Sequence, residues 1–202
     1  MSSILRRSDY EDYLVHVYFG RIDDPMQACL RRAYLDFNRT LRDIAKLENN
    51  ISHKATKVLK EMFALIQETN APAPKQFDEW HRSSCDRLKA TYRECGYTRF
   101  SVGHAQKWLN MTIKYIFVLG EARLPGFAHL YDLCHVPLDN ILMDRLRADF
   151  GFQPLPCAWS KLDDYEIYVD RQQWVRNHFP LAPLDAEFCL WIGRPVSTTK
   201  WP

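Results

Sequence analysis

Two stretches of the sequence decide the fold: RLKATYRECGYTRFSVGHAQKWLNMTIKYIFVL, residues 87–119, and CHVPLDNILMDRL, residues 134–146. The first stretch contains the end of a predicted helix from Lys75 to Glu94, a turn from Tyr97 to Gly103, and a second predicted helix from His104 to Glu121. Apolar residues recur at helical spacing in both helices, and a glycine follows the first one, where glycine favours helix termination. We therefore expect two consecutive helices joined by a short glycine-containing turn.

The second stretch places an aspartate at the start of a further helix. Pro137 restricts Val136 to extended backbone, and Asp139 directly precedes apolar residues at helical spacing that continue to Phe150. Because an aspartate at the N-cap accepts hydrogen bonds from free backbone N–H groups, we predict that Asp139 caps this helix.

The rest of the chain also shows helical spacing with capping residues and lacks alternating strand patterns, so we predict an all-α fold. One remaining helix is predicted to begin at a Ser8/Glu11 capping box, and a second begins at Asp24-Pro25 and continues to Leu47. A third helix is predicted from Ser52 to Thr69, and a fourth begins at a Ser160/Asp163 cap and reaches His178. The last predicted helix runs from Leu184 to Ile192.

A chain of 202 residues is long enough to bury one full core. We expect a single domain over residues 1–202, with helical subdomains 1–72 and 73–202 divided near Pro72 and Pro74. In this arrangement a cleft lies between the subdomains, and the C-terminal helix packs back on the cleft.

Composition excludes several classes of protein. The chain has no apolar run of signal-peptide or membrane-spanning length, so we expect a cytoplasmic protein without membrane contact. Its six cysteines form no CxxC pair, which argues for reduced, buried thiols and against a zinc or iron–sulfur site. Residues 82–123 carry eight Lys or Arg against three Asp or Glu, a balance that suits phosphate binding or an ordinary solvated surface.

The chain is predicted to contain, in order, a helix, a glycine-bearing turn, a second helix, a loop and an apolar-Pro-apolar-Asp element. This order resembles that of the helix-hairpin-helix DNA glycosylase superfamily, and within it that of the archaeal 8-oxoguanine DNA glycosylase family. Lys107 and Lys114 stand seven residues apart on the post-hairpin helix, as two lysines do in that family, and Pro137-Leu138-Asp139 matches its Pro-apolar-Asp element. The chain departs from the superfamily in lacking the usual Leu-Pro-Gly-x-Gly hairpin.

A second match lies near the C-terminus, where that family has an acidic residue four positions before a Trp-apolar-Gly. Glu187, Trp191, Ile192 and Gly193 follow this pattern, with Glu in place of the family's Asp. The resemblance implies that Glu187 and Trp191 hold the damaged base, and we add Trp108 and Trp159 as aromatic candidates behind them, because a base that leaves the stack needs an aromatic plane and polar groups.

The resemblance implies that Lys107 and Asp139 are the catalytic residues. A lysine attacks C1′ of a nucleoside only as a neutral amine, and burial or a helix N-terminus lowers the pKa of a lysine. Lys107 is expected within the first turn of its helix. A carboxylate that steadies an oxocarbenium-like centre must stay ionised, which suits the N-cap position of Asp139.

The predicted partner is double-stranded DNA with a flipped modified base, bound by a monomer without metal or cofactor. We expect backbone N–H groups of Gly103, His104 and Ala105, together with Arg99, to bind DNA phosphates. The reaction implied is base excision through a Schiff base on Lys107, followed by strand cleavage by β-elimination. The resemblance implies an 8-oxoguanine-like base, while the changed acid leaves room for another lesion or for a bulky modified base of phage DNA removed in defence.

Two alternative functions are consistent with the sequence. Arg99 and His104 show the Arg-x4-His spacing of HEPN-like helical ribonucleases, although the predicted turn separates the two residues. The basic middle of the chain also suits a non-catalytic nucleic-acid-binding protein, which predicts salt-sensitive DNA binding without an abasic product. His135 beside Cys134 has no second close pair to complete a metal site, so we expect both residues to serve in packing.

Overall fold

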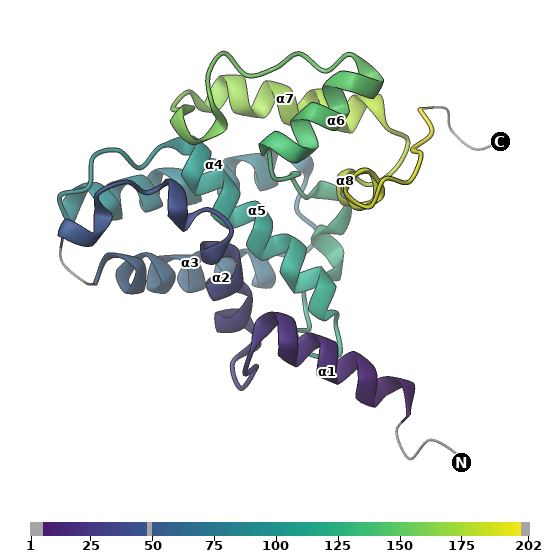
Figure 1. The fold of residues 1–202 in the computed structure, drawn as a ribbon, viewed down its shortest axis with the longest axis horizontal. Coiled ribbons are helices and arrows are strands. Elements are labelled where there is room, and N and C mark those ends of the chain that lie inside the picture. The colour runs from purple at the N-terminus through teal and green to yellow at the C-terminus, as the bar shows by residue number, and fades with distance from the viewer. Residues whose placement is uncertain (1–5, 48–49, 199–202) are drawn as a thin grey trace.

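The structure, a computed structural model, describes residues 6–47 and 50–198, and these residues form an all-α fold without strands (Figure 1). The predicted fold class is confirmed at this level. Short 3-10 turns connect several of the helices. The α-helices are α1 (Arg7–Phe19), α2 (Pro25–Leu35), α3 (Ile51–Glu68), α4 (Pro74–Glu94), α5 (Val102–Leu119), α6 (Asn140–Phe150), α7 (Tyr165–His178) and α8 (Pro183–Trp191).

Helix α5 lies at the centre of the fold, with α1, α2 and α3 on one side and α6, α7 and α8 on the other (Figure 1). All but two of its residues are buried, because other elements cover it on every side. Its polar side chains are therefore also buried and must find partners inside the protein. This requirement places the charged residues of α5 opposite charged residues of later helices.

The start of α1 differs from the predicted capping box. The N-cap lies two residues earlier than expected, so Ser8 lies inside the helix and Arg6 occupies the N-cap position. The Arg6 N–H donates to the Asp9 carboxylate at 2.7 Å. An aspartate three residues after the N-cap performs the role that the sequence assigned to Glu11.

Helix α2 begins as predicted but ends early. The Asp24 side chain accepts a hydrogen bond from the Gln27 N–H at 2.9 Å. The helix ends at Leu35 rather than near Leu47, and two short 3-10 turns follow. The break allows the chain to turn and bury Phe37 completely in the core.

The connection from α4 to α5 contains the expected glycine, Gly96, with φ of 83°. Its N–H donates to the Arg93 carbonyl, and the Tyr97 N–H donates to the Tyr92 carbonyl, both at 2.9 Å. These two bonds form a Schellman motif, which ends α4 where the sequence predicted.

The prediction that Gly103 belongs to the turn is wrong. Helix α5 begins at Val102 with Ser101 as its N-cap, so Gly103 lies in the first helical turn. A Cβ atom at Gly103 would lie 1.7 Å from the Trp159 carbonyl oxygen, and the Gly103 N–H donates to the Leu162 carbonyl at 2.8 Å. The glycine therefore permits close backbone packing rather than a hairpin turn.

The start of α7 also differs from the prediction. Ser160 lies in a 3-10 turn over Trp159–Lys161, and Asp164 is the N-cap residue instead. The Asp164 side chain accepts from the N–H groups of Glu166 and Ile167 at 2.8 and 3.3 Å. Ser160 is used elsewhere, since its carbonyl accepts a hydrogen bond from the Ser101 hydroxyl at 2.9 Å.

One continuous hydrophobic core joins residues from both sides of the proline pair at Pro72 and Pro74. The helices of the described residues are too short or too polar to cross a membrane. Of the six cysteines, three are buried and Cys157 is exposed, so the expectation of buried thiols holds only in part.

Candidate active site

The predicted catalytic residues Lys107 and Asp139 lie together. Asp139 caps α6 as expected, and its Oδ1 accepts from the Leu142 N–H at 2.9 Å. Its Oδ2 forms an ion pair with Lys107 Nζ, which reaches it from α5. The two side chains are 6% and 20% exposed, so the pair is accessible mainly from the carboxylate side. Lys107 lies in the second turn of α5, not the first, because the helix begins at Val102.

A pair of buried amide side chains fixes the backbone that leads into Asp139. Gln106 Nε2 donates to the Leu138 carbonyl at 3.0 Å, and the Leu138 N–H donates to Gln106 Oε1 at 3.2 Å. Asn110 Nδ2 donates to Gln106 Oε1 and to the Val136 carbonyl, both at 3.1 Å. Gln106 and Leu138 directly precede the two members of the ion pair, so this amide clasp sets how the lysine and the aspartate face each other.

A second ion pair lies one to two helical turns further along α5. Lys114 Nζ is 2.7 Å from Glu187 Oε1, and each side chain is only 5% exposed. Burial lowers the pKa of Lys114 and raises the pKa of Glu187, while the opposite charge of the partner counteracts each shift. Lys114 Nζ also lies 4.9 Å from the Phe188 ring centre and 5.5 Å from the Trp191 ring centre. Glu187 Oε2 is buried without a hydrogen-bond partner among the described residues.

Both ion pairs line one pocket of about 550 Å³. This volume falls within the range of small-molecule binding sites. The pocket walls come from α1, α2, the turn after α2, α5, the start of α6, the turn before α7, and α8. The lining residues are Tyr18, Arg32, Asp36, Arg39, Lys107, Met111, Lys114, Tyr115, Val118, Asp139, Asn140, Ile141, Trp159, Glu187 and Trp191.

Large apolar side chains from four different helices line the pocket and remain exposed to solvent. Tyr18, Val118 and Ile141 are each 47% exposed, and Trp191 is 46% exposed. Exposed apolar side chains that gather around a polar pocket mark a binding site rather than a random surface. We call these four residues the apolar collar.

Of the four predicted base-binding residues, the structure brings three to the pocket. Glu187, Trp191 and Trp159 line it. Trp108 does not, because it is buried in the core and its Nε1–H donates to the Leu30 carbonyl at 3.0 Å. The prediction for Trp108 is therefore wrong, because the need for an aromatic plane does not show which side chains of the helix face the pocket.

The predicted phosphate grip at residues 103–105 is also wrong. The N–H of Gly103 donates to the Leu162 carbonyl, that of His104 to Ser101 Oγ, and that of Ala105 to the Ser101 carbonyl. All three residues are buried. Their backbone groups are used within the protein and are not available to bind a phosphate.

The arrangement of Arg99 and His104 does not suit a ribonuclease pair. Arg99 lies in the turn before α5, is exposed, and pairs with Asp43 at 3.1 Å. His104 lies inside the helix, where its Nδ1 contacts Ser101 Oγ at 2.9 Å, and burial lowers its pKa to about 4. An exposed, paired arginine and a buried neutral histidine lack the shared accessible face that this chemistry requires.

Sequence reasoning missed the wall that the N-terminal helices contribute. Arg32 and Asp36 pair at 3.2 Å along α2, and the Tyr115 hydroxyl donates to Asp36 at 2.5 Å. The Tyr18 hydroxyl lies 2.9 Å from that of Tyr115, and the Arg32 guanidinium lies 4.4 Å from the centre of the Tyr18 ring. The Arg32/Asp36 spacing was the only available signal, and such pairs are common on helix surfaces.

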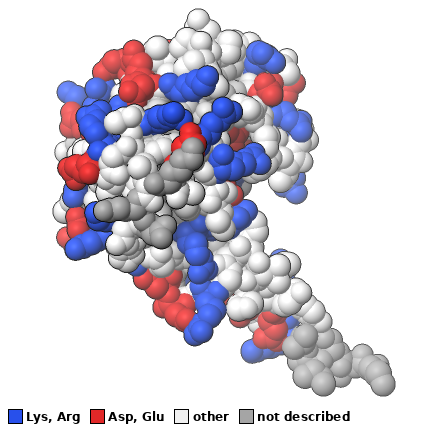
Figure 2. Space-filling view, turned by 60° about the vertical axis from the view of Figure 1, so that its left-hand side comes forward, with Lys and Arg blue, Asp and Glu red and all other residues white. Residues whose placement is uncertain are grey.

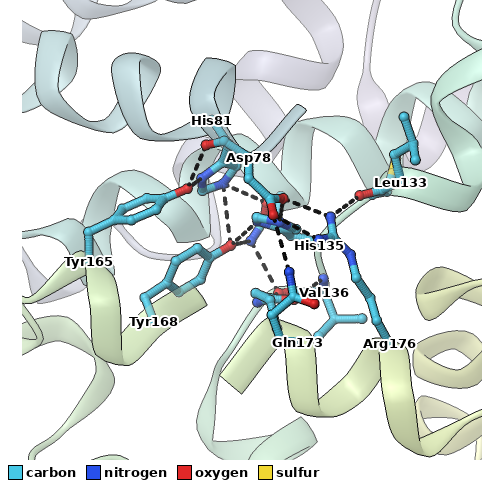
Figure 3. Close-up of polar contacts among 12 residues, drawn as sticks. Asp78, His81, Leu133, His135, Val136, Tyr165, Tyr168, Gln173 and Arg176 are labelled. Carbon is cyan, nitrogen blue, oxygen red and sulfur yellow. Dashed lines mark hydrogen bonds and ion pairs between the residues drawn. The ribbon is translucent and has the colours of Figure 1, made fainter. Parts of the chain in front are cut away.

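Behind the pocket, a buried polar network joins α4, α5, α7 and the segment before α6 (Figure 3). His135 Nε2 lies 2.7 Å from Asp78 Oδ1, and its Nδ1 lies 2.8 Å from the Tyr168 hydroxyl. Asp78 also accepts two bonds from Arg176 at 2.8 and 3.0 Å. Asn110 Nδ2 donates to the Tyr168 hydroxyl at 2.8 Å, which connects this network to the amide clasp.

The network gives His135 the packing role that the sequence suggested. His135 is fully buried, and desolvation lowers its pKa to about 4, so it is neutral near pH 7. In the part of the chain that the structure describes, no group of three or more His, Cys, Asp or Glu side chains has the arrangement of a metal site.

Positive and negative side chains alternate over much of the surface, and several Lys and Arg side chains lie near a hollow between the body of the protein and its N-terminal arm (Figure 2). In comparisons with protein-family models, with curated proteins and with solved structures, no match to this chain was found. The resemblance to the glycosylases therefore rests on the short motifs of the sequence.

Proposed function

We propose that this protein is a DNA glycosylase with abasic-site lyase activity, in which Lys107 is the nucleophile and Asp139 the supporting carboxylate. The observation that carries the proposal is the contact of the Lys107 amine with the Asp139 carboxylate in a pocket with aromatic walls. We further propose a helix-hairpin-helix glycosylase-like arrangement of two helical subdomains around a cleft. The protein would act in the cytoplasm on duplex DNA, as a monomer without a metal or cofactor.

The proposed reaction begins when Lys107 gives up a proton to solvent, while Asp139, the carboxylate it contacts, stays ionised. The neutral amine then forms a bond to C1′ while the bond from C1′ to the base breaks, and the base leaves with the electron pair and gains a proton. A second amine proton then moves to the ring oxygen O4′ as the C1′–O4′ bond breaks, which opens the sugar and leaves C1′ doubly bonded to the lysine nitrogen as a Schiff base. Removal of a C2′ proton then expels the 3′ phosphate and cleaves the strand.

The walls of the pocket suit an extruded base. Trp159 and Trp191 offer aromatic planes, and the Lys114/Glu187 pair offers a donor and an acceptor for the base edge. The apolar collar offers contacts to the bases that lose a stacking neighbour when one nucleotide leaves the duplex. We propose an 8-oxoguanine-like base as the substrate, or a bulky modified base of phage DNA.

The test is borohydride trapping of the protein on duplexes that carry a panel of modified bases, with alkali treatment to reveal abasic sites. We expect a trapped complex with at least one duplex. Lys107→Gln should abolish trapping, and Asp139→Asn should reduce the rate by about 10²–10⁴-fold. His104→Ala should fold less stably but keep the reaction, because His104 does not line the pocket.

The proposal fails if no duplex gives a trapped or abasic product that depends on both residues. Binding of duplex DNA without any product would instead support the non-catalytic alternative. Loss of a nuclease activity on RNA with His104→Ala but not with Lys107→Gln would support the ribonuclease alternative.

A further inference from the structure

Three ion pairs account for nearly all of the charge in the pocket wall. Each carboxylate that lines the pocket is matched by one cation, in the pairs Arg32–Asp36, Lys107–Asp139 and Lys114–Glu187. One charged side chain in the lining, Arg39, then remains. Arg39 is exposed, follows directly on α2, and has no hydrogen bond or ion pair with any described residue. The pocket therefore carries one uncompensated positive charge at its N-terminal wall.

A second unpaired arginine lies on the other side of the catalytic pair. Arg145 belongs to α6 and lines a small adjoining cavity that shares Asp139, Ile141, Glu187 and Trp191 with the main pocket. It is exposed and, within the described part of the chain, makes no hydrogen bond or ion pair.

The two arginines come from different elements of the fold. Arg39 belongs to the 3-10 turn Asn38–Thr40 after α2 and lines the main pocket, whereas Arg145 belongs to α6 and lines the adjoining cavity. Figure 1 shows α2 and α6 on opposite sides of α5. Some other exposed arginines are instead paired with an acid. Arg147, on the same helix as Arg145, pairs with Asp144 at 3.5 Å, and Arg21 pairs with Asp23 at 3.0 Å.

We propose that Arg39 and Arg145 bind the DNA phosphates that flank the extruded nucleotide, one on each side of the pocket. A nucleotide that enters this pocket brings the phosphates on its two sides to the pocket's rim. A guanidinium group without an internal partner can offer all its N–H donors to phosphate oxygens in a bidentate contact. This inference rests on the proposed function, and it supplies the phosphate contacts that the backbone of residues 103–105 cannot make.

The test measures binding to a duplex with a tetrahydrofuran abasic analogue, which lacks the C1′ hydroxyl and therefore cannot form a Schiff base. Affinity is measured by fluorescence anisotropy over a series of salt concentrations. Each phosphate neutralised contributes about 0.9 to the slope of log K against log salt. We expect Arg39→Gln and Arg145→Gln each to reduce this slope by about one, and the double variant by about two.

The matched controls are Arg21→Gln and Arg147→Gln, which remove the same charge from exposed arginines that pair with an acid. We expect their salt slopes to stay within the error of the wild type, and all variants to show the wild-type circular dichroism spectrum. If the wild type binds and processes DNA while the Arg39 and Arg145 variants match these controls, the inference is wrong and the proposed function stands. If the wild type does not bind the duplex, both are wrong.

Discussion

Replacing Lys114 with methionine is expected to destabilise the fold strongly, because it leaves the Glu187 carboxylate buried without its partner. The two side chains are each 5% exposed and their charged atoms lie 2.7 Å apart. Removing one partner of a buried ion pair costs about 3–5 kcal/mol. For a chain of this size each kcal/mol lowers Tm by about 2–4 °C, so the expected decrease is roughly 6–20 °C. The double variant Lys114→Met/Glu187→Gln should recover most of the loss.

The pH dependence of the loss distinguishes this mechanism from simple loss of packing. Burial raises the pKa of Glu187. At acidic pH the unpaired Glu187 of Lys114→Met is therefore protonated and uncharged, and the loss of stability is small. The loss grows as pH rises through the raised pKa and the buried carboxyl becomes charged. In Glu187→Gln the opposite holds. Burial lowers the pKa of Lys114 below its usual 10.5, so the deficit shrinks as pH rises above the lowered value and the amine becomes neutral.

The assay is urea unfolding followed by circular dichroism at pH 5, 7 and 9. Arg7→Met serves as the control, because Arg7 and Glu11 form an exposed pair with side chains 93% and 56% accessible. We expect that control to change the free energy of unfolding by less than about 1 kcal/mol. The reasoning is refuted if both single variants stay within about 1 kcal/mol of the wild type at pH 7, or if their deficits change with pH in the same direction.

Three further predictions follow from single residues. Gly103→Ala should lower the free energy of unfolding by about 1–3 kcal/mol or more, because the added Cβ meets the Trp159 carbonyl oxygen at 1.7 Å; an unchanged urea midpoint would contradict this packing. Gln106→Ala should slow the proposed trapping reaction by about 10²-fold with little change in KM, since the clasp on Leu138 positions the proposed catalytic carboxylate, Asp139; a rise in KM alone would contradict a positioning role. Burial lowers the pKa of His135 to about 4, below the usual 6.5, so the unfolded state binds more protons than the folded state between these pH values and stability should rise with pH there. In His135→Gln the urea midpoint should therefore rise less between pH 4.5 and 7 than in the wild type. An identical rise in the two proteins would refute the lowered pKa of His135.

Several helix ends could be predicted because the residues that decide them are adjacent in the sequence. Asp24 and Asp139 accept hydrogen bonds from the N–H groups three residues later, and Gly96 takes the left-handed backbone that ends α4. These interactions need no partner from elsewhere in the chain.

Other local signals failed because a distant segment overruled them. Gly103 looked like a turn glycine, yet it lies inside α5 because the backbone at Trp159 packs against it. Trp108 looked like a pocket aromatic, yet it is buried in the core and its Nε1–H donates to the Leu30 carbonyl. Neither the neighbouring carbonyl nor the direction in which α5 faces is visible in the local sequence.

The sequence by itself determined that the chain is helical and where several of its helices begin or end, and it placed Lys107 and Asp139 on consecutive helices. It also indicated Glu187 and Trp191 as residues of a common site. Only the tertiary structure decided which charged side chains form ion pairs, because α5 is buried on nearly all sides and each of its lysines must face a carboxylate. Lys107 pairs with a carboxylate 32 residues away in the sequence, and Lys114 with one 73 residues away. It also decided that the N-terminal helices supply a wall of the pocket, with Arg39 left unpaired there among the described residues.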